Sequence, residues 1–184
     1  MNMMKESEKQ CAYTHTEMIQ WDSSWPALSK EEEKKQLVEY MEKRFGIPAY
    51  LFADYQFFCH RNSWHILKKS LYLSEGAKLK VSGYYGMKAF YKVGKYIKPT
   101  TRMIQLFGRS ADRNIIFLTT EQACRLVNDC KVHIFEKIED GYVIITIEER
   151  YIVGLGLVIG GVLTDQLSGS LKQLLKPTLI DHKI

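Results

Sequence analysis

The stretch of sequence that decides the fold spans residues 114–163 and reads NIIFLTTEQACRLVNDCKVHIFEKIEDGYVIITIEERYIVGLGLVIGGVL. Its first part, residues 114–118, is apolar and β-branched, which predicts a strand. Thr119 and Gln122 then have the spacing of a helix N-terminal cap. Ala123, Leu126 and Val127 follow at the intervals of one helix face. We therefore expect a strand that leads directly into a short helix.

The remainder of this region is rich in strand-forming residues. Residues 131–135, 142–147 and 151–158 are dense in β-branched and aromatic side chains, and Gly160 and Gly161 mark a hairpin turn before Val162. Residues 168–175 predict a closing helical turn that stops at Pro177. Several short strands with one helix favour a small closed barrel, which leaves no unpaired strand edge.

Upstream, the pattern predicts an amphipathic helix. Ser29 and Glu32 form an S-x-x-E capping box, and Gly46 and Pro48 end the helix. Apolar residues recur at every fourth position on its buried face: Leu37, Met41 and Phe45. Residues 1–28 show no clear periodicity and are expected to form an extension of the folded body.

Residues 50–107 change to short aromatic runs separated by glycines. The runs at 55–58, 64–67, 70–73 and 79–85 predict strands of a small sheet packed on the helix. We place a domain boundary after the apolar segment 103–107, near Gly108. The expected fold class is α+β: an N-terminal α/β adaptor at 29–107, a small β pseudo-barrel at 108–178, and a tail at 179–184.

Positive charge is concentrated in the middle of the chain. Residues 66–113 carry 11 Lys and Arg against 2 Asp and Glu, whereas residues 1–60 carry 7 against 10 and residues 114–184 carry 7 against 9. A local cationic surplus between acidic flanks is typical of a surface that binds a polyanion. The basic residues are Lys68, Lys69, Lys78, Lys80, Lys88, Lys92, Lys95, Lys98, Arg102, Arg109 and Arg113.

Aromatic residues alternate with these cations, and the combination favours RNA. The aromatic residues are Tyr84, Tyr85, Phe90, Tyr91 and Tyr96. Cations displace counterions from phosphates, and rings stack on unpaired bases. The alternative is an ordinary solvated surface with tyrosines half in the core.

Two arrangements of residues 87–96 are open. As a helix, this segment would place Lys88, Lys92 and Lys95 on one face; as a strand, Lys88, Lys92 and Lys98 would share a side. The expected RNA contacts also include Tyr91. Residues beside the expected domain junction are candidates for specific contacts: Arg102, Arg109, Arg113 and Asn114.

Several of these segments resemble a PUA domain and its preceding adaptor. The resemblance rests on KPTT at 98–101, QLFG at 105–108, Asn114, LT at 118–119, GYV at 141–143 and GLG at 154–156, and covers residues 30–176. The arrangement is similar to the C-terminal region of Sun-type rRNA 5-methylcytosine methyltransferases and to stand-alone ribosome-assembly factors with a pre-PUA and a PUA domain. The resemblance implies a pre-PUA-like adaptor, a PUA-like barrel and binding of rRNA or tRNA, with ribosome-assembly proteins or an RNA-modifying enzyme as partners. None of the four cysteines follows a proline, so the catalytic cysteine pattern of those methyltransferases is missing.

Other motifs favour structural roles. The glycines from Gly154 to Gly161 have G-x-G-x-x-x-G spacing without a following helix, so we interpret them as tight packing and a turn rather than a dinucleotide loop. Cys59, His60 and His65 lack a fourth ligand with recognisable spacing, so no metal is expected.

No catalytic motif and no cofactor are expected either. Neither a nucleophile beside a base nor a phosphate-binding loop stands out. The cysteine spacing and the absence of a long apolar segment predict a cytoplasmic protein with reduced thiols and no membrane partner. Two other hypotheses are a protein interaction module in a ribonucleoprotein assembly and a small enzyme whose site is not visible in the sequence.

Overall fold

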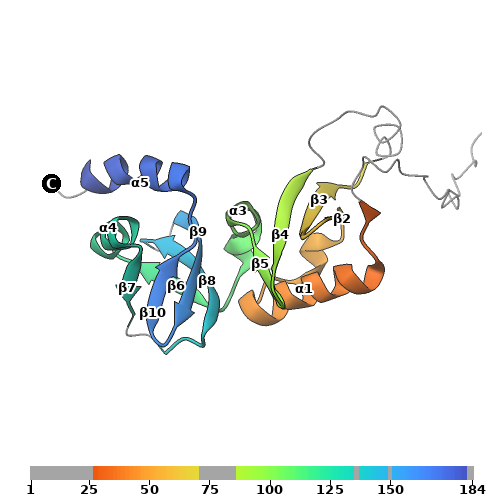
Figure 1. Cartoon of the computed structure of the whole chain (residues 1–184), viewed down its shortest axis with the longest axis horizontal. Helices are drawn as coiled ribbons and strands as arrows, with labels where there is room; N and C mark the ends of the chain where they lie inside the picture. Colours follow the sequence, from red (N-terminus) through yellow and green to blue (C-terminus); the bar gives the residue numbers. More distant parts are fainter. Residues whose placement is uncertain (1–26, 71–85, 135–136, 149–150, 182–184) are drawn as a thin grey trace, which may run out of the picture.

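The computed structural model describes residues 27–70, 86–134, 137–148 and 151–181. These residues form two five-stranded sheets with helices packed on them, so the α+β class is confirmed (Figure 1). The strand order is β1-β2-β3-β4-β5 in the first sheet and β6-β8-β9-β10-β7 in the second. Some expected features lie outside the described residues: the strand expected at 79–85, most of the strand expected at 70–73, and the residues Lys78, Lys80, Tyr84 and Tyr85.

The first sheet is antiparallel throughout and begins within the expected N-terminal extension, since Ala27 and Leu28 pair with β2. Its elements are β1 Ala27–Leu28, α1 Glu31–Phe45, the 3-10 helix η1 Ala49–Phe52, β2 Tyr55–His60, β3 Ser63–Lys68, β4 Met87–Val93 and β5 Tyr96–Pro99.

Helix α1 forms where its periodicity predicts. Leu37, Met41 and Phe45 are buried in the core, as expected. Three glutamates in the first turn and two basic residues in the last turn interact favourably with the helix dipole. Gly46 ends the helix with a left-handed φ of 68°, a conformation that costs glycine little.

The predicted capping box at the start of α1 is wrong. Lys30 is the N-cap residue, and no side chain caps the helix. The backbone N–H of Ser29 instead donates to the carbonyl of Phe57 at 3.0 Å, which holds Ser29 on the sheet beside β1. Ser29 therefore lies one residue before the N-cap, and the third residue of the helix is Glu33 rather than Glu32.

The second sheet combines a parallel β6–β8 pair with antiparallel neighbours elsewhere. Its strands and the helices around it are α3 Thr101–Phe107, the 3-10 helix η2 Gly108–Ser110, β6 Ile115–Leu118, α4 Thr120–Asp129, β7 Lys131–His133, β8 Gly141–Ile147, β9 Tyr151–Ile159, β10 Val162–Asp165 and α5 Gly169–Asp181.

The capped helix predicted after residue 118 is confirmed as α4. The Thr119 hydroxyl accepts from the Gln122 N–H at 3.2 Å, and the Gln122 side chain accepts from the Thr119 N–H at 2.9 Å. Ala123, Leu126 and Val127 are buried against the second sheet. This reciprocal cap satisfies two N–H groups that the first turn would otherwise leave unpaired.

The second sheet is open, contrary to the closed barrel expected from the sequence. β6 and β7 are its two edges, and no pairing among the described residues joins them. Helix α4, which connects these strands, contacts both of them and β10. The apolar face of α4 covers the core of the second sheet, which in a closed barrel would be enclosed by pairing of the edge strands.

Helix α5 continues past Pro177, although the sequence predicted a stop there. Proline removes one N–H donor, but its fixed φ of about −65° is itself helical. A proline at this position is therefore compatible with a helix that runs on to Asp181.

Helix α3 lies between the two sheets and packs on both β4 and β9 (Figure 1). Its Met103, Ile104 and Phe107 share one buried cluster with Ile144 and Leu155 of the second sheet. Gly154 allows this approach, because an added Cβ there would lie 2.7 Å from Thr101 Cγ2 of α3. Gly156 instead leaves room within the second sheet, where an added Cβ would lie 2.6 Å from Leu163 Cδ1 of β10. Their predicted role in tight strand packing is confirmed.

Candidate nucleic-acid interface

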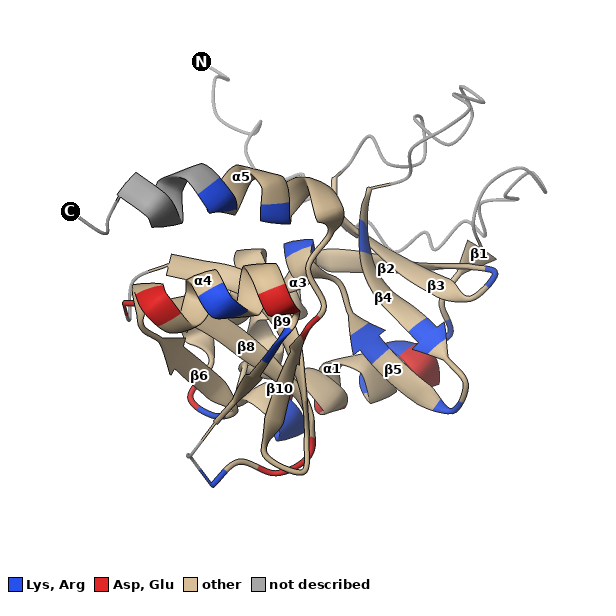
Figure 2. Cartoon of the chain, turned by 60° about the vertical axis from the view of Figure 1, so that its left-hand side comes forward, with Lys and Arg blue, Asp and Glu red and all other residues tan. Residues whose placement is uncertain are grey.

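The β4–β5 hairpin carries five of the nine residues predicted to contact RNA. Residues 87–99 contain four lysines and no acidic residue. Gly94, with φ 59°, turns the chain, and Val93 pairs with Tyr96 across the hairpin. Figure 2 shows basic residues over β4, β5 and the connection between them.

The hairpin is extended, so the alternative of a helix over 87–96 is wrong. The predicted strand parity is wrong for Lys92, because the register between β3 and β4 shifts where Trp64 pairs with Phe90 and His65 with Lys88. Ala89 is the extra residue of this bulge, and both Ala89 and Phe90 are buried. Lys88 consequently shares a side with Tyr91, whereas Lys92 lies on the opposite side. Lys98 pairs with Tyr91 and so shares the side of Lys88, as the strand alternative predicted.

Three exposed lysines of the hairpin, Lys88, Lys92 and Lys95, are here called the hairpin lysines. Two of these lysines lie over a neighbouring tyrosine ring. Lys88 Nζ is 5.0 Å from the centroid of the Tyr91 ring, and Lys95 Nζ is 5.3 Å from the centroid of the Tyr96 ring. Within the described residues none of the three forms an ion pair. Their charges therefore remain available to phosphate.

Lys98 has a different setting. It is half-buried, and its Nζ donates to Gln166 Oε1 at 2.6 Å. Burial lowers the pKa of Lys98, because desolvation disfavours the charged form. This lysine thus joins the hairpin to the segment after β10.

The remaining predicted contacts lie along the connection into the second sheet. Arg102 and Arg109 are exposed on α3 and η2. Arg113 is paired with Asp112, with Nε 2.9 Å from Oδ1. Asn114 has a left-handed φ of 54°, and its Nδ2 donates to the Arg44 carbonyl at 2.5 Å. Asn114 therefore stabilises the fold, and the predicted set does not form one surface of free side chains.

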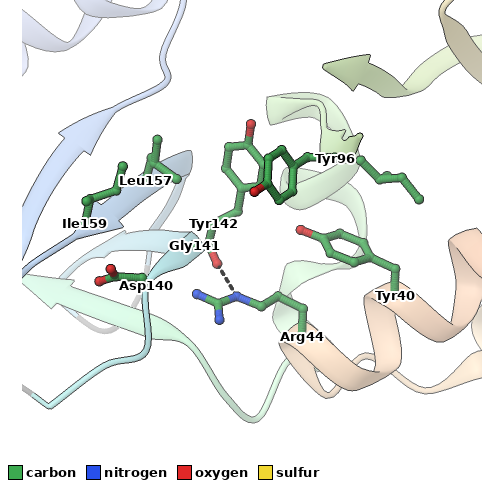
Figure 3. Close-up of a pocket in the computed structure, with 9 residues that line it drawn as sticks. Tyr40, Arg44, Tyr96, Asp140, Gly141, Tyr142, Leu157 and Ile159 are labelled. Carbon is green, nitrogen blue, oxygen red and sulfur yellow. Dashed lines mark hydrogen bonds between the residues drawn. The ribbon is translucent and has the colours of Figure 1, made fainter. Parts of the chain in front are cut away.

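Sequence reasoning missed a cleft beside the hairpin. Its volume is about 510 Å³, and it opens where α1, β5, β8 and β9 meet (Figure 3). We call it the tyrosine cleft; its lining residues are Tyr40, Arg44, Tyr96, Ile97, Asp140, Gly141, Tyr142, Leu157 and Ile159. These residues come from distant parts of the chain, so the spacing of residues along the sequence does not predict the cleft.

Arg44 fixes one wall of the cleft. Its Nε donates to the Tyr142 carbonyl at 2.7 Å (Figure 3), and its Nη2 donates to the Glu139 carbonyl at 2.9 Å. The side chain is 13% exposed, and its Nη1 also lies 3.8 Å from the Glu139 carboxylate. A guanidinium is suited to this position because its planar fork can reach two carbonyls at once.

The tyrosines of the cleft differ in exposure. Burial raises the pKa of Tyr40 far above its usual value and also raises the pKa of Tyr142, so both hydroxyls are protonated at neutral pH. Tyr40 packs edge-on against Phe45 with ring centroids 6.0 Å apart. Tyr96 is 62% exposed. Figure 3 shows the hydroxyl end of Tyr40 pointing toward the other two rings.

The other motifs have structural settings. His60 and His65 have ring centroids 6.3 Å apart on adjacent strands, and the described residues contain no His, Cys, Asp and Glu group with the geometry of a metal site. The glycine-rich segment from Gly154 lies within β9 and the turn after it, with no helix at its end.

Comparison of the chain with protein-family models and with curated protein sequences gave no match. No helix in the described part of the chain is long and apolar enough to cross a membrane.

Proposed function

We propose that this protein binds structured RNA, of the rRNA or tRNA kind, through the β4–β5 hairpin. The observation that carries the proposal is the hairpin itself: three exposed lysines without described ion pairs, two of them over tyrosine rings, on a segment with no acidic residue. Because the strands fix the backbone, each charge has a defined position on the hairpin, with Lys88 and Lys92 on opposite sides of it.

The chemistry of the hairpin suits RNA better than a featureless polyanion. Lysines contribute affinity by releasing counterions from phosphates, and exposed rings stack on bases that are not paired. Tyr91 and Tyr96, which are 41% and 62% exposed, supply such rings beside Lys88 and Lys95. In this proposal the protein acts as an RNA-binding protein and not as an enzyme, and RNA binding requires no cofactor.

The proposal includes the PUA-like assignment and its cellular setting. The strand, capped helix and further strands of residues 115–165 are compatible with a PUA-like domain following a pre-PUA-like adaptor. We propose a role in ribosome maturation or in presenting RNA to a separate modification enzyme, in the cytoplasm.

A filter-binding titration with structured rRNA and tRNA fragments tests this function. We expect binding that weakens steeply with salt and is lost when the hairpin lysines are replaced by glutamate. The matched control replaces three exposed lysines outside the hairpin, here called the control lysines: Lys131, Lys137 and Lys176. Equal loss in both triple variants, a flat salt response or no binding would contradict the proposal; a flat response would instead favour a protein interaction module.

A further inference from the structure

We propose that the tyrosine cleft holds one unpaired base of the bound RNA while the hairpin lysines contact the neighbouring phosphates. This inference rests on the proposed function and adds a subsite that the basic hairpin does not by itself imply.

The walls of the cleft suit a flat heteroaromatic ring. Tyr40, Tyr96 and Tyr142 supply aromatic surface, and Leu157 and Ile159 supply aliphatic surface beside Tyr142 (Figure 3). Tyr142 and Leu157 are direct partners across β8 and β9, so the sheet holds them side by side. The cleft volume of about 510 Å³ lies within the common range for small ligands, about 300–1,000 Å³.

Two large apolar side chains that line the cleft, those of Tyr96 and Ile159, remain largely exposed to solvent. Tyr96 is 62% exposed and Ile159 is 61% exposed. Lys95 lies over the Tyr96 ring at 5.3 Å, so a cation stands beside aromatic surface that is still open to solvent. Stacking on such a ring with a phosphate on the adjacent cation is a common way to bind single-stranded nucleotides.

The hydroxyls of Tyr40 and Tyr142 add hydrogen-bonding capacity. Neither has a protein hydrogen-bond partner in the part of the chain that is described. Since both are protonated at neutral pH, each can donate to or accept from the edge of a base.

Charge gives the cleft a direction. Lys95 is beside Tyr96 at one end, and Asp140 is at the other, where its Oδ1 accepts from the Gly160 N–H at 2.9 Å. Glu139 also lies at the acidic end, 3.8 Å from Arg44. Phosphate is therefore favoured near Lys95, and a base amino group near the second oxygen of Asp140. Adenine, cytosine and guanine carry such an amino group, and uracil does not.

Binding of two RNAs separates this inference from the proposed function. One RNA is a hairpin with an unpaired loop of cytidines, and the other is a fully paired duplex with the same number of phosphates. We expect Tyr96→Ala to weaken binding of the loop RNA about tenfold and to leave duplex binding within about twofold, since stacking acts only on unpaired bases. Tyr96→Phe should recover the loss because it keeps the ring.

Tyr50→Ala is the matched control, because Tyr50 is 73% exposed in η1 and does not line the cleft. If Tyr96→Ala weakens neither RNA, or weakens both equally, the base subsite is refuted while hairpin binding stands. If the wild-type chain binds neither RNA, the proposed function fails and this inference fails with it.

A second measurement locates the base directly. Loop RNA containing 5-iodocytidine, which keeps the amino group, is crosslinked by light to the full chain, and the attached peptide is identified by mass spectrometry. We expect crosslinks to the peptides of Tyr40, Tyr96 or Tyr142. Crosslinks confined to other peptides would overturn the assignment. A loop of uridines should bind more weakly than the cytidine loop, and equal binding would contradict the proposed direction of the base.

Discussion

Arg44 is the residue whose replacement most directly tests the junction between α1 and the second sheet. We consider Arg44→Met, which keeps the apolar stem and removes the guanidinium. The variant loses two hydrogen bonds, to the carbonyls of Tyr142 and Glu139. The ion pair with the Glu139 carboxylate adds little, because that carboxylate is 91% exposed.

The expected loss follows from these contacts. A hydrogen bond from a charged donor contributes about 1.5–3 kcal/mol, and the carbonyl of Glu139 regains water when the guanidinium leaves, so we expect roughly 2–4 kcal/mol in total. For a chain of this length, that corresponds to a fall in Tm of roughly 5–15 °C. Urea and thermal unfolding followed by circular dichroism would measure it.

Lys43→Met is the control, since Lys43 is 80% exposed and its ion pair within the described residues is with Glu39 on the same helix. We expect it to change the free energy of unfolding by less than about 0.5 kcal/mol. Gly141→Ala provides an independent perturbation, because its new Cβ would lie 3.0 Å from Arg44 Cζ, at a backbone φ of 130°. Its effect should be smaller in the Arg44→Met background. If Arg44→Met is as stable as wild type, the guanidinium does not join the two parts as argued.

Three further outcomes are expected. Replacing the three hairpin lysines with glutamine should reduce the slope of log K against log salt for RNA binding by about 2–3, since each phosphate contact contributes about 0.7–0.9; the control lysines replaced in the same way should leave the slope unchanged. Lys172→Met should destabilise the chain by about 3 kcal/mol, because Lys172 Nζ lies 2.8 Å from the Asp165 carboxylate, which is 3% exposed, and Asp165→Asn in the same chain should restore part of the loss in urea unfolding. Gly156→Ala should cost about 1–3 kcal/mol by overpacking against Leu163, as measured by thermal unfolding, and Leu163→Ala should relieve the crowding in the double variant.

The helices that the sequence predicted well depend on local information. α4 needs only the reciprocal cap of Thr119 and Gln122 and three apolar positions, all within nine residues of chain. The start of α1 could not be predicted in this way, because Ser29 is held by the carbonyl of Phe57 on a neighbouring strand. A local motif fails where a distant hydrogen bond satisfies the same group first.

The side-chain directions on β4 show the same limit. Parity along a strand predicts that Lys88 and Lys92 share a side, and this holds only when the pairing is regular. The bulge at Ala89 depends on how β3 pairs with β4, and the sequence of residues 87–93 alone does not predict it. Similarly, Lys98 looks like any other lysine of the basic stretch, but its partner Gln166 is 68 residues away.

Two contacts that the sequence does not predict would hold the tyrosine cleft and the hairpin lysines in place relative to each other, so that both could bind one RNA. Binding a base and its phosphate together requires the tyrosine cleft and the hairpin lysines to keep a fixed separation, since flexibility between them would have to be lost on binding. Lys98 ties the hairpin to the segment after β10, and Arg44 ties α1 to the start of β8. Each tie contains a residue that lines the cleft or lies beside it. Weakening either should therefore reduce loop-RNA affinity more than duplex affinity, because only the loop RNA needs both sites at once.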